Sequence, residues 1–474
     1  MDRKKELAKN TVILMVGKIL TQFVSFFMLP LYTAVLTPGE YGLVDLFNTY
    51  CTLLLPLFNW QFDSGLFRFL LDVRDNKEDQ KKIVSSVLSV CSIQSIIYLL
   101  FFAVAQNFIT AEYKYYLAID VVLNIFLSAL LQFARGIGKT TNYTVSSFIS
   151  ATSNICLNVL FIAVLRFGAE GMFLATVLSK VVTILYMTIS LKVVRYYAVH
   201  LFDKSIIKQI ARYSFPLIPN QLSWWVVGAS DRVIVSKVIG VAANGVYSIA
   251  NKFSGLFVSF YNIFNLSWTE SVSLHLDEED SEKFLTETIN DMFKLFTCTC
   301  IEIVAVLPFA FFVIINNQYA DAYNHVPILM LAVVFPIIVG LYSVIYVALK
   351  KTHEIAKTSF FAAVINISTN VVLIKFIGLY AASVSTFVAY FSMAIYRYID
   401  IKKYKKVPLK RKIVLKECLI GAITIFAYYS KNRTIQVLIL IIASVHFFID
   451  NRIFILFVLK KTMNMWKGIR RENE

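Results

Sequence analysis

Charged side chains interrupt long apolar stretches of this sequence, where an ionised group is costly and usually faces a bundle interior or a wet cavity. They are Lys18, Asp45, Asp231, Arg232 and Lys252, with Arg68 just beyond the end of one stretch. A guanidinium presents a planar fork to phosphate oxygens, and an ammonium group acts as a point charge. We therefore expect a phosphate-bearing substrate to be bound by the four cations, Arg68, Arg232, Lys18 and Lys252.

These cations also have structural interpretations. Arg68 would mark the cytoplasmic boundary of a span, and Lys18 would extend to the interface. Arg232 and Lys252 would form ion pairs between helices. Asp231 and Arg232 are adjacent and point about 100° apart on a helix, so at least one of them needs a partner elsewhere. The other charges in apolar stretches favour structural roles: Asp120, Lys180, Glu302, Asp450 and Arg452.

Amide and aromatic side chains gather on the same stretches as these charges. They are Asn59, Trp60, Gln61, Gln221 and Trp224. Amides bond to hydroxyl groups and indole rings stack on sugar rings, so these residues are a weak prediction of glycan contact. The alternative is an aromatic belt, because Trp and Tyr are enriched at both bilayer interfaces.

The elements that must hold these residues are membrane helices. Hydrophobic residues make up 58% of the 474 residues and charged ones only 16%, against about a quarter charged in soluble domains. This excludes a disordered, collagen-like or disulfide-scaffold protein and disfavours a soluble enzyme. We expect an all-α polytopic protein of about 14 transmembrane helices, with apolar runs at 11–36, 41–62, 83–105, 115–135, 140–165, 170–194, 214–238, 241–266, 289–315, 325–349, 355–376, 378–399, 414–430 and 434–459.

The basic residues predict which way the spans run. Fourteen spans place both termini on one side, and 35 of the 46 Lys and Arg residues fall on that side, including nine in the connector 397–416. The opposite side holds six. The positive-inside rule therefore predicts that both termini are cytoplasmic. No signal peptide is expected before the first apolar run.

Metal, cofactor and nucleic-acid chemistry have no support in the sequence. Cys298 and Cys300 point to different faces of a helix, and no histidine lies near them in the chain. The five histidines form no metal-binding motif. We therefore predict no metal site and no cofactor. The excess positive charge lies beside membrane spans, which argues against nucleic-acid binding.

An internal repeat runs through the first twelve spans. Asn154-x-x-x-Asn158 recurs as Asn366-x-x-x-Asn370, and other short matches occur at similar offsets. A six-span unit has an even number of spans, so both copies share an orientation, as in transporters with parallel repeats. We predict an N-terminal lobe at 1–200, a C-terminal lobe at 201–400, and a third segment at 401–474 with a basic connector, two spans and the cytoplasmic tail.

The spans that carry these charges resemble a known family. Ser230-Asp231-Arg232-x-Ile234, followed by Gly245-x-Tyr247-Ser248-x-Ala250-x-Lys252-Phe253, is similar to polysaccharide-repeat flippases. Gly65-Leu66-Phe67-Arg68-Phe69 also matches. The family is that of the Wzx-type O-antigen and capsule exporters, within the multidrug/oligosaccharidyl-lipid/polysaccharide exporter superfamily.

The resemblance implies two six-helix lobes around a central cavity, with two further helices outside. It also implies transfer of undecaprenyl-pyrophosphate-linked oligosaccharide across the bacterial cytoplasmic membrane, rather than catalysis. Arg68 and Arg232 match family positions, whereas Lys18 matches none. No Walker A motif occurs, so we expect an H⁺ or Na⁺ gradient to supply energy, with Asp45 and Asp231 as weak candidates for the ion site. A polysaccharide polymerase would be a further partner.

Two rival functions differ in the chemistry they need. A multidrug antiporter of organic cations would favour an acidic cavity. The charged residues named above that lie on or just beyond the spans 11–36, 41–62, 214–238 and 241–266 are net basic, with four cations and two acids. A membrane glycosyltransferase or polymerase would need a sizeable external loop, and the expected external loops are about ten residues or shorter.

Overall fold

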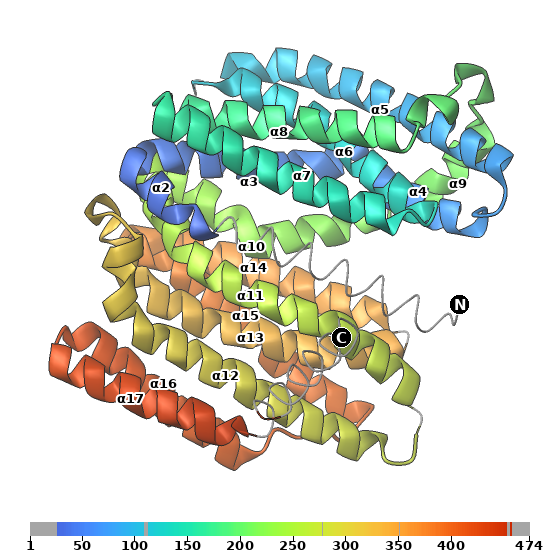
Figure 1. The fold of residues 1–474 in the computed structure, drawn as a ribbon. Helices are drawn as coiled ribbons and strands as arrows, with labels where there is room; N and C mark the ends of the chain where they lie inside the picture. The colour runs from blue at the N-terminus through green and yellow to red at the C-terminus, as the bar shows by residue number, and fades with distance from the viewer. Residues whose placement is uncertain (1–25, 109–111, 277, 350, 453–455, 457–474) are drawn as a thin grey trace, which may run out of the picture. The chain divides into compact units, whose positions relative to one another are not determined.

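A computed structural model describes residues 26–108, 112–276, 278–349, 351–452 and 456. All regular secondary structure in these ranges is helical (Figure 1). The helices are α2 (Leu29–Val35), α3 (Pro38–Asn59), α4 (Phe62–Asp72), α5 (Lys77–Ala105), α6 (Lys114–Gly136), α7 (Thr140–Asn158), α8 (Gly168–Ser190), α9 (Lys204–Ser214), α10 (Leu217–Val238), α11 (Val241–His275), α12 (Ser281–Ile314), α13 (Ala322–Ala348), α14 (Thr352–Ile377), α15 (Tyr380–Asp400), α16 (Arg411–Ser430) and α17 (Arg433–Asp450), with a π-helical turn at Val159–Val164 that continues α7.

These helices confirm the expected all-α polytopic class. Among the described residues, ten helices are long and apolar enough to cross a membrane. Helices α10, α11 and α15 also coincide with predicted spans but are not among the ten. Each carries a basic side chain: Arg232, Lys252 and Arg397, respectively. The first predicted span is described only from residue 26, where it contains α2. The protein is therefore a multi-pass membrane protein.

The chain forms two compact units. Unit 1 comprises Met1–Lys252 and Ser359–Ser385, and unit 2 comprises Phe253–Thr358 and Thr386–Glu474. Each unit combines segments that are distant in sequence. The division into lobes at residues 200 and 400 stays a prediction.

Helix α4 in unit 1 was not expected from the apolar runs. The chain leaves α3 through Trp60 and Gln61, which both adopt the left-handed conformation, with φ of 51° and 56°. A β-carbon on Gly65 would lie 2.6 Å from side-chain atoms of both Ile210 and Ser214. The glycine is therefore required for the close packing of α4 on α9.

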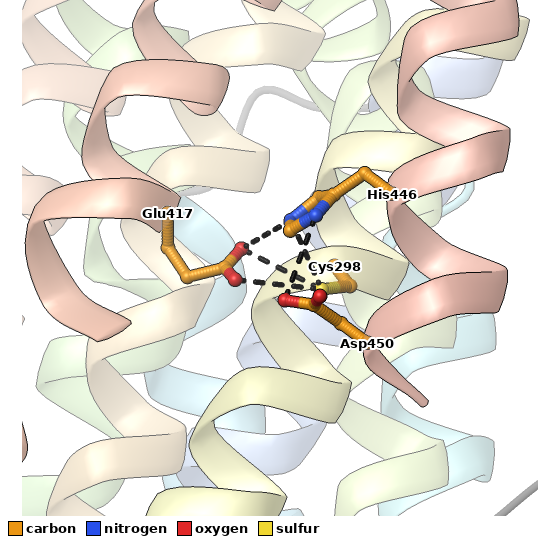
Figure 2. A group of neighbouring side chains, drawn as sticks. All are labelled: Cys298, Glu417, His446 and Asp450. Carbon is orange, nitrogen blue, oxygen red and sulfur yellow. Dashed lines mark hydrogen bonds and ion pairs between the residues drawn. The ribbon is translucent and has the colours of Figure 1, made fainter. Parts of the chain in front are cut away.

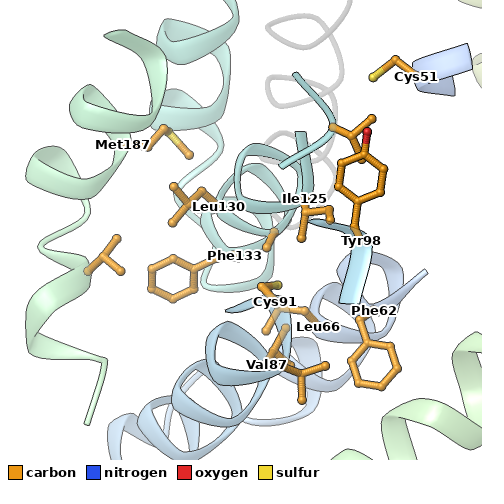
Figure 3. Close-up of a cluster of buried hydrophobic side chains, with 14 of the residues drawn as sticks. Cys51, Phe62, Leu66, Val87, Cys91, Tyr98, Ile125, Leu130, Phe133 and Met187 are labelled. Atoms are coloured by element: carbon orange, nitrogen blue, oxygen red, sulfur yellow. The ribbon is translucent and has the colours of Figure 1, made fainter. Parts of the chain in front are cut away.

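The apolar core of unit 1 fixes the positions of α3 to α6 and α8. Phe62 and Leu66 on α4 are buried with Val87 on α5 and Leu130 and Phe133 on α6 (Figure 3). This core stabilises α3 and α4, which carry Asp45 and Arg68.

Arg397 is buried in a helix, although the sequence places it in an exposed connector. Arg397, assigned by the span pattern to a cytoplasmic connector, is a fully buried residue of α15 in unit 2. Its guanidinium donates to the hydroxyls of Thr358 and Ser343 and to the carbonyl of Ile355. The charge at this position therefore contributes to helix packing.

Candidate functional site

A polar network in unit 1 joins α3, α10 and α11. Arg232 Nε on α10 lies 3.2 Å from Asp45 Oδ2 on α3. The same carboxylate oxygen accepts a hydrogen bond from Ser248 Oγ at 2.5 Å and lies 3.5 Å from Asn244 Nδ2. Asn244 Nδ2 also donates to the carbonyl of Gly42 at 2.9 Å. Asp45 is thus held by an ion pair from α10 and by hydrogen-bond donors from α11.

The neighbour of Arg232 has a separate set of partners. Asp231 is buried and accepts hydrogen bonds from Asn370 Nδ2 at 2.7 Å, Ser385 Oγ at 3.3 Å and Tyr247 OH at 3.2 Å. Asp231 therefore connects α10 to α11, α14 and α15 within unit 1. The expectation that adjacent opposite charges need partners on other helices holds for both residues.

One stripe of α10 is exposed and leads to Arg232. Gln221 and Gly228 are exposed, Trp224 is 39% exposed, and the Arg232 side chain is 24% exposed. Spacings of three and four residues place these positions on one helix face. A β-carbon on Gly228 would meet no atom within 4 Å. The stripe therefore offers an amide, an indole and a guanidinium to a molecule outside the packed core.

Helix α11 contributes three polar side chains to the Asp45 network. Asn244, Ser248 and Lys252 are four residues apart and share one side of the helix. Lys252 is half-buried and close enough to Asp45 and Arg232 to interact electrostatically with both. The sequence analysis missed Asn244 and Ser248, although their spacing from Lys252 is a signal that could have found them.

Arg68 lies apart from the helices that carry this network. It is exposed on α4, where Nη1 forms an ion pair of 2.5 Å with Asp72 Oδ1. The hydrogen bond and the charge of that carboxylate raise the pKa of the guanidinium. Lys18 is outside the described residues. A substrate role for either residue stays a prediction.

The residues expected to contact a glycan differ in their availability. Asn59 is buried and hydrogen-bonded to Asp63, to the Gln61 amide and, through its carbonyl, to Gln94. Its side chain thus shapes the α3–α4 junction. Trp60 packs edge-on against aromatic rings, whereas Gln221 and Trp224 are exposed. Glycan contact stays a prediction for all five residues expected to make it.

A second ion pair in unit 1 joins α6 to α8. Lys180 Nζ on α8 contacts Asp120 Oδ1 on α6, and the two side chains are 17% and 11% exposed. Asn124 Nδ2 donates to the other Asp120 oxygen at 3.1 Å. These contacts agree with the structural interpretation of Asp120 and Lys180.

Two helix N-termini meet beside the Asp45 network. A β-carbon on Gly42 of α3 would lie 2.0 Å from the Val241 carbonyl oxygen, and one on Gly245 of α11 would lie 2.0 Å from the Pro38 carbonyl oxygen. Only glycine permits this backbone contact. The predicted topology places these helix ends on the external side of the membrane.

Known structures define the class of this fold. An inward-facing multidrug-resistance MATE transporter of the MOP superfamily aligns with a TM-score of 0.69 and 15% identity, over 83% of this chain and 98% of that chain. The lipid II flippase MurJ, in an inward closed conformation, aligns with a TM-score of 0.67 and 16% identity, over 94% and 100%. A MOP transporter from Pyrococcus furiosus, described as having a binding pocket of reverse polarity, aligns with a TM-score of 0.57 and 16% identity, over 84% and 96%. The fold is that of MOP-superfamily transporters.

The sequence itself defines the family. A family model for polysaccharide biosynthesis proteins matches residues 7–268, more than half of the 474 residues. The chain belongs to this polysaccharide biosynthesis protein family. No curated protein gives a significant sequence match. The family match confirms the resemblance inferred from the sequence, and the solved structures show the same fold.

Proposed function

We propose that this protein is a flippase for undecaprenyl-pyrophosphate-linked oligosaccharide repeat units in the bacterial cytoplasmic membrane, with both termini cytoplasmic. The polysaccharide family supports a glycan substrate, and the MOP fold is shared with a protein named as a lipid II flippase. The polyprenyl tail can remain in the hydrocarbon during transfer, but the charged head cannot cross without a polar path. The protein supplies that path and catalyses no covalent step.

The observation that carries this proposal is the position of Arg232. It ends an exposed stripe of α10 with an indole and an amide, and Lys252 lies near it on α11. A guanidinium binds pyrophosphate oxygens through paired hydrogen bonds, and the indole offers a face to a sugar ring. The head group would thus lie along α10 with its pyrophosphate at Arg232.

Asp45 makes the binding of pyrophosphate reversible. Its carboxylate and the substrate compete for the same guanidinium, since Arg232 Nε lies 3.2 Å from Asp45 Oδ2. Protonation of Asp45 releases Arg232 for the substrate, and deprotonation recovers the ion pair. Proton binding and substrate binding at this pair are therefore linked, so an imposed pH difference should change the flipping rate. Asp231, with three hydrogen-bond donors around it, is the weaker candidate for an ion site.

Closure of the contact between Gly42 and Gly245 would seal one end of the path. A β-carbon on either glycine would lie only 2.0 Å from the facing carbonyl oxygen, so the closed contact leaves no space for a sugar. Separation of α3 from α11 would break this contact together with the contacts of Ser248 and Asn244 with Asp45. Alternating access then follows from a single rearrangement, with the head group exposed to one side at a time.

The partners of Asp45 and Asp231 argue against the rival function, an antiporter of organic cations. Arg232 neutralises Asp45, and Asp231 is buried among its hydrogen-bond donors. Lys252 remains as a half-buried cation in this neighbourhood. The result favours an anionic ligand over an organic cation.

Transport in proteoliposomes tests the proposal. A fluorescent undecaprenyl-pyrophosphate oligosaccharide is reconstituted with wild type, Arg232→Ala or the control Arg433→Ala, whose guanidinium bonds to the Pro308 carbonyl on another helix. We expect the first variant to lose at least about tenfold in flipping rate, since it loses a bidentate charged contact, and the control to resemble wild type. Flipping of no lipid-linked glycan by wild type would refute the function, and equal rates for Arg232→Ala would refute the site.

A further inference from the structure

Four side chains with metal-binding atoms converge in unit 2, and none of them belongs to the network proposed for transport. Cys298 belongs to α12, Glu417 to α16, and His446 and Asp450 to α17. One potential ligand atom from each residue lies within 4.8 Å of those from the other three, and their side chains point toward one another in Figure 2. The first three residues are buried. We propose that Cys298, Glu417 and His446 bind a divalent transition-metal ion of the Zn²⁺ class, with Asp450 orienting the histidine.

The distances among the three proposed ligands match those of a tetrahedral site. Cys298 Sγ lies 3.4 Å from His446 Nε2 and 3.5 Å from Glu417 Oε2, and these two atoms are 3.1 Å apart. Zinc bonds of about 2.3 Å to sulfur and about 2.0–2.1 Å to nitrogen or oxygen place tetrahedral ligand atoms about 3.3–3.6 Å apart. Only small side-chain shifts are needed to admit the ion.

The second ring nitrogen of His446 supports the same assignment. His446 Nδ1 lies 3.6 Å from Asp450 Oδ2, and Lys416 Nζ pairs with that carboxylate at 2.6 Å. A metal-bound histidine usually presents its other ring nitrogen to a carboxylate, which fixes the tautomer and the ring orientation. Asp450 therefore acts on the metal through His446, and Lys416 balances its charge.

Charge and donor chemistry select the kind of ion. A thiolate, a carboxylate and a neutral imidazole carry two negative charges, which a divalent ion neutralises. Thiolate and imidazole favour zinc and similar ions over the hard cations Mg²⁺ and Ca²⁺. Glu417 also lines a cavity of about 310 Å³ whose lining is almost entirely apolar. A buried carboxylate beside such a cavity needs compensation of this kind.

The consequence for the molecule is a cross-link among three helices of unit 2. Helices α16 and α17 pack on α12, and a small apolar cluster that includes Ile301 and Ala443 lies at this contact. A bound ion would join the two helices that follow the predicted repeat to a helix within it. The site shares no residue with the proposed substrate site.

Metal titration of the purified full-length protein tests this site without any measurement of transport. The chelator-treated protein is titrated with Co²⁺, whose bond to a thiolate gives a ligand-to-metal charge-transfer absorption, and Zn²⁺ is then used to displace it. We expect one Co²⁺ per chain with this absorption and full displacement by Zn²⁺. Wild type that binds no Co²⁺ in stoichiometric amount overturns the proposal.

Variants identify the ligands. Cys298→Ser should remove the charge-transfer absorption, whereas the matched control Cys300→Ser, a buried cysteine bonded to the Met330 carbonyl, should retain it. Asp450→Asn should weaken Zn²⁺ binding about 10–100-fold while retaining the absorption. Absorption that persists in Cys298→Ser, or that is lost equally in Cys300→Ser, overturns the assignment. If Cys298→Ser does not fold, Glu417→Gln decides: weaker Zn²⁺ binding supports the site and unchanged binding refutes it.

Discussion

Arg232 on α10 and Asp45 on α3 form an ion pair of 3.2 Å that leaves both side chains partly accessible, at 24% and 12%. Ser248 and Asn244 hold the carboxylate from α11. A fully sealed pair would be a structural contact, and a fully exposed one would stabilise the fold little. The Asp120–Lys180 pair is exposed to a similar extent, so the exchange of anionic partners is inferred from the exposed stripe of α10 that leads to Arg232.

Replacement of Asp45 should separate substrate binding from gradient coupling. Asp45→Asn removes the anion that competes for Arg232, so we expect about tenfold tighter binding of undecaprenyl pyrophosphate, which corresponds to about 1.4 kcal/mol. Flipping should no longer respond to a proton gradient. Fluorescence titration in detergent measures the first effect, and proteoliposomes with and without an imposed pH difference measure the second. Unchanged affinity together with a normal response to the gradient would contradict the competition.

The partners of Asp231 should matter mainly for stability. Asn370→Ala removes the 2.7 Å hydrogen bond to a buried carboxylate. Hydrogen bonds to charged groups contribute about 1.5–3 kcal/mol in soluble proteins, but bonds between membrane helices average only about 0.6 kcal/mol. Since Ser385 and Tyr247 still donate to Asp231, we expect a loss between these figures, about 1 kcal/mol. Unfolding in mixed micelles measures it, and a loss above about 3 kcal/mol would show that Asn370 has a larger role.

The sequence could predict the helices but not the break between α3 and α4. Apolar runs of spanning length locate membrane helices, because hydrocarbon requires both apolar side chains and internally bonded backbone. The positive φ values of Trp60 and Gln61 have no local signal, since neither residue favours that conformation. Helix α4 is amphipathic and only 11 residues long, so the apolar runs leave it in the connector between 62 and 83.

The charged residues of the candidate site could be predicted from the sequence, but most of the side chains that pair with them could not. Asp45, Asp231 and Arg232 stand out because ionised groups are rare in apolar runs. Asn370 was visible as part of a repeat, but nothing in the sequence shows which carboxylate it meets. Such pairings depend on tertiary packing across more than a hundred residues.

The sequence gives even less indication that Cys298, Glu417 and His446 lie together. Its members come from three helices and have no motif spacing. A prediction of metal binding from sequence needs ligands that are close in the chain. Here only the packing of α16 and α17 on α12 brings them together.

The buried pair of Asp120 and Lys180 should behave as a structural contact. Lys180→Met leaves a carboxylate that is 11% exposed without its counter-ion, and such losses cost about 3–5 kcal/mol. A double variant, Asp120→Leu with Lys180→Met, replaces both charges with apolar groups and should recover most of that stability. Thermal unfolding of the purified protein distinguishes the two. A double variant less stable than the single one would mean that Asp120 has another essential partner.

The glycine contact between α3 and α11 should control access to the predicted external side. Gly245→Ala places a β-carbon 2.0 Å from the Pro38 carbonyl oxygen, so the helix ends must separate. We expect flipping to fall about tenfold, since an end that cannot close prevents alternation; a closure made less favourable by about 1.4 kcal/mol is enough. The control is Gly255→Ala, where no atom lies within 4 Å of the new β-carbon.

Labelling of a cysteine placed at Ser248 tests the physical basis of that effect. An impermeant thiol reagent added from outside should react faster in the Gly245→Ala background than with the native glycine. Equal labelling would mean that the helix ends still close. Reaction only from the cytoplasmic side would reverse the predicted topology.

Arg68 offers the sharpest distinction between a boundary residue and a substrate ligand. Its pair with Asp72 is exposed, so Arg68→Ala should leave thermal unfolding unchanged. Lys77→Ala, at the start of α5, removes another cation beyond the end of α4 and serves as the control. If Arg68 meets the pyrophosphate as the head group enters, flipping falls at least about tenfold in Arg68→Ala and remains normal in Lys77→Ala. Equal rates in the two variants would leave Arg68 only the role of marking the cytoplasmic side.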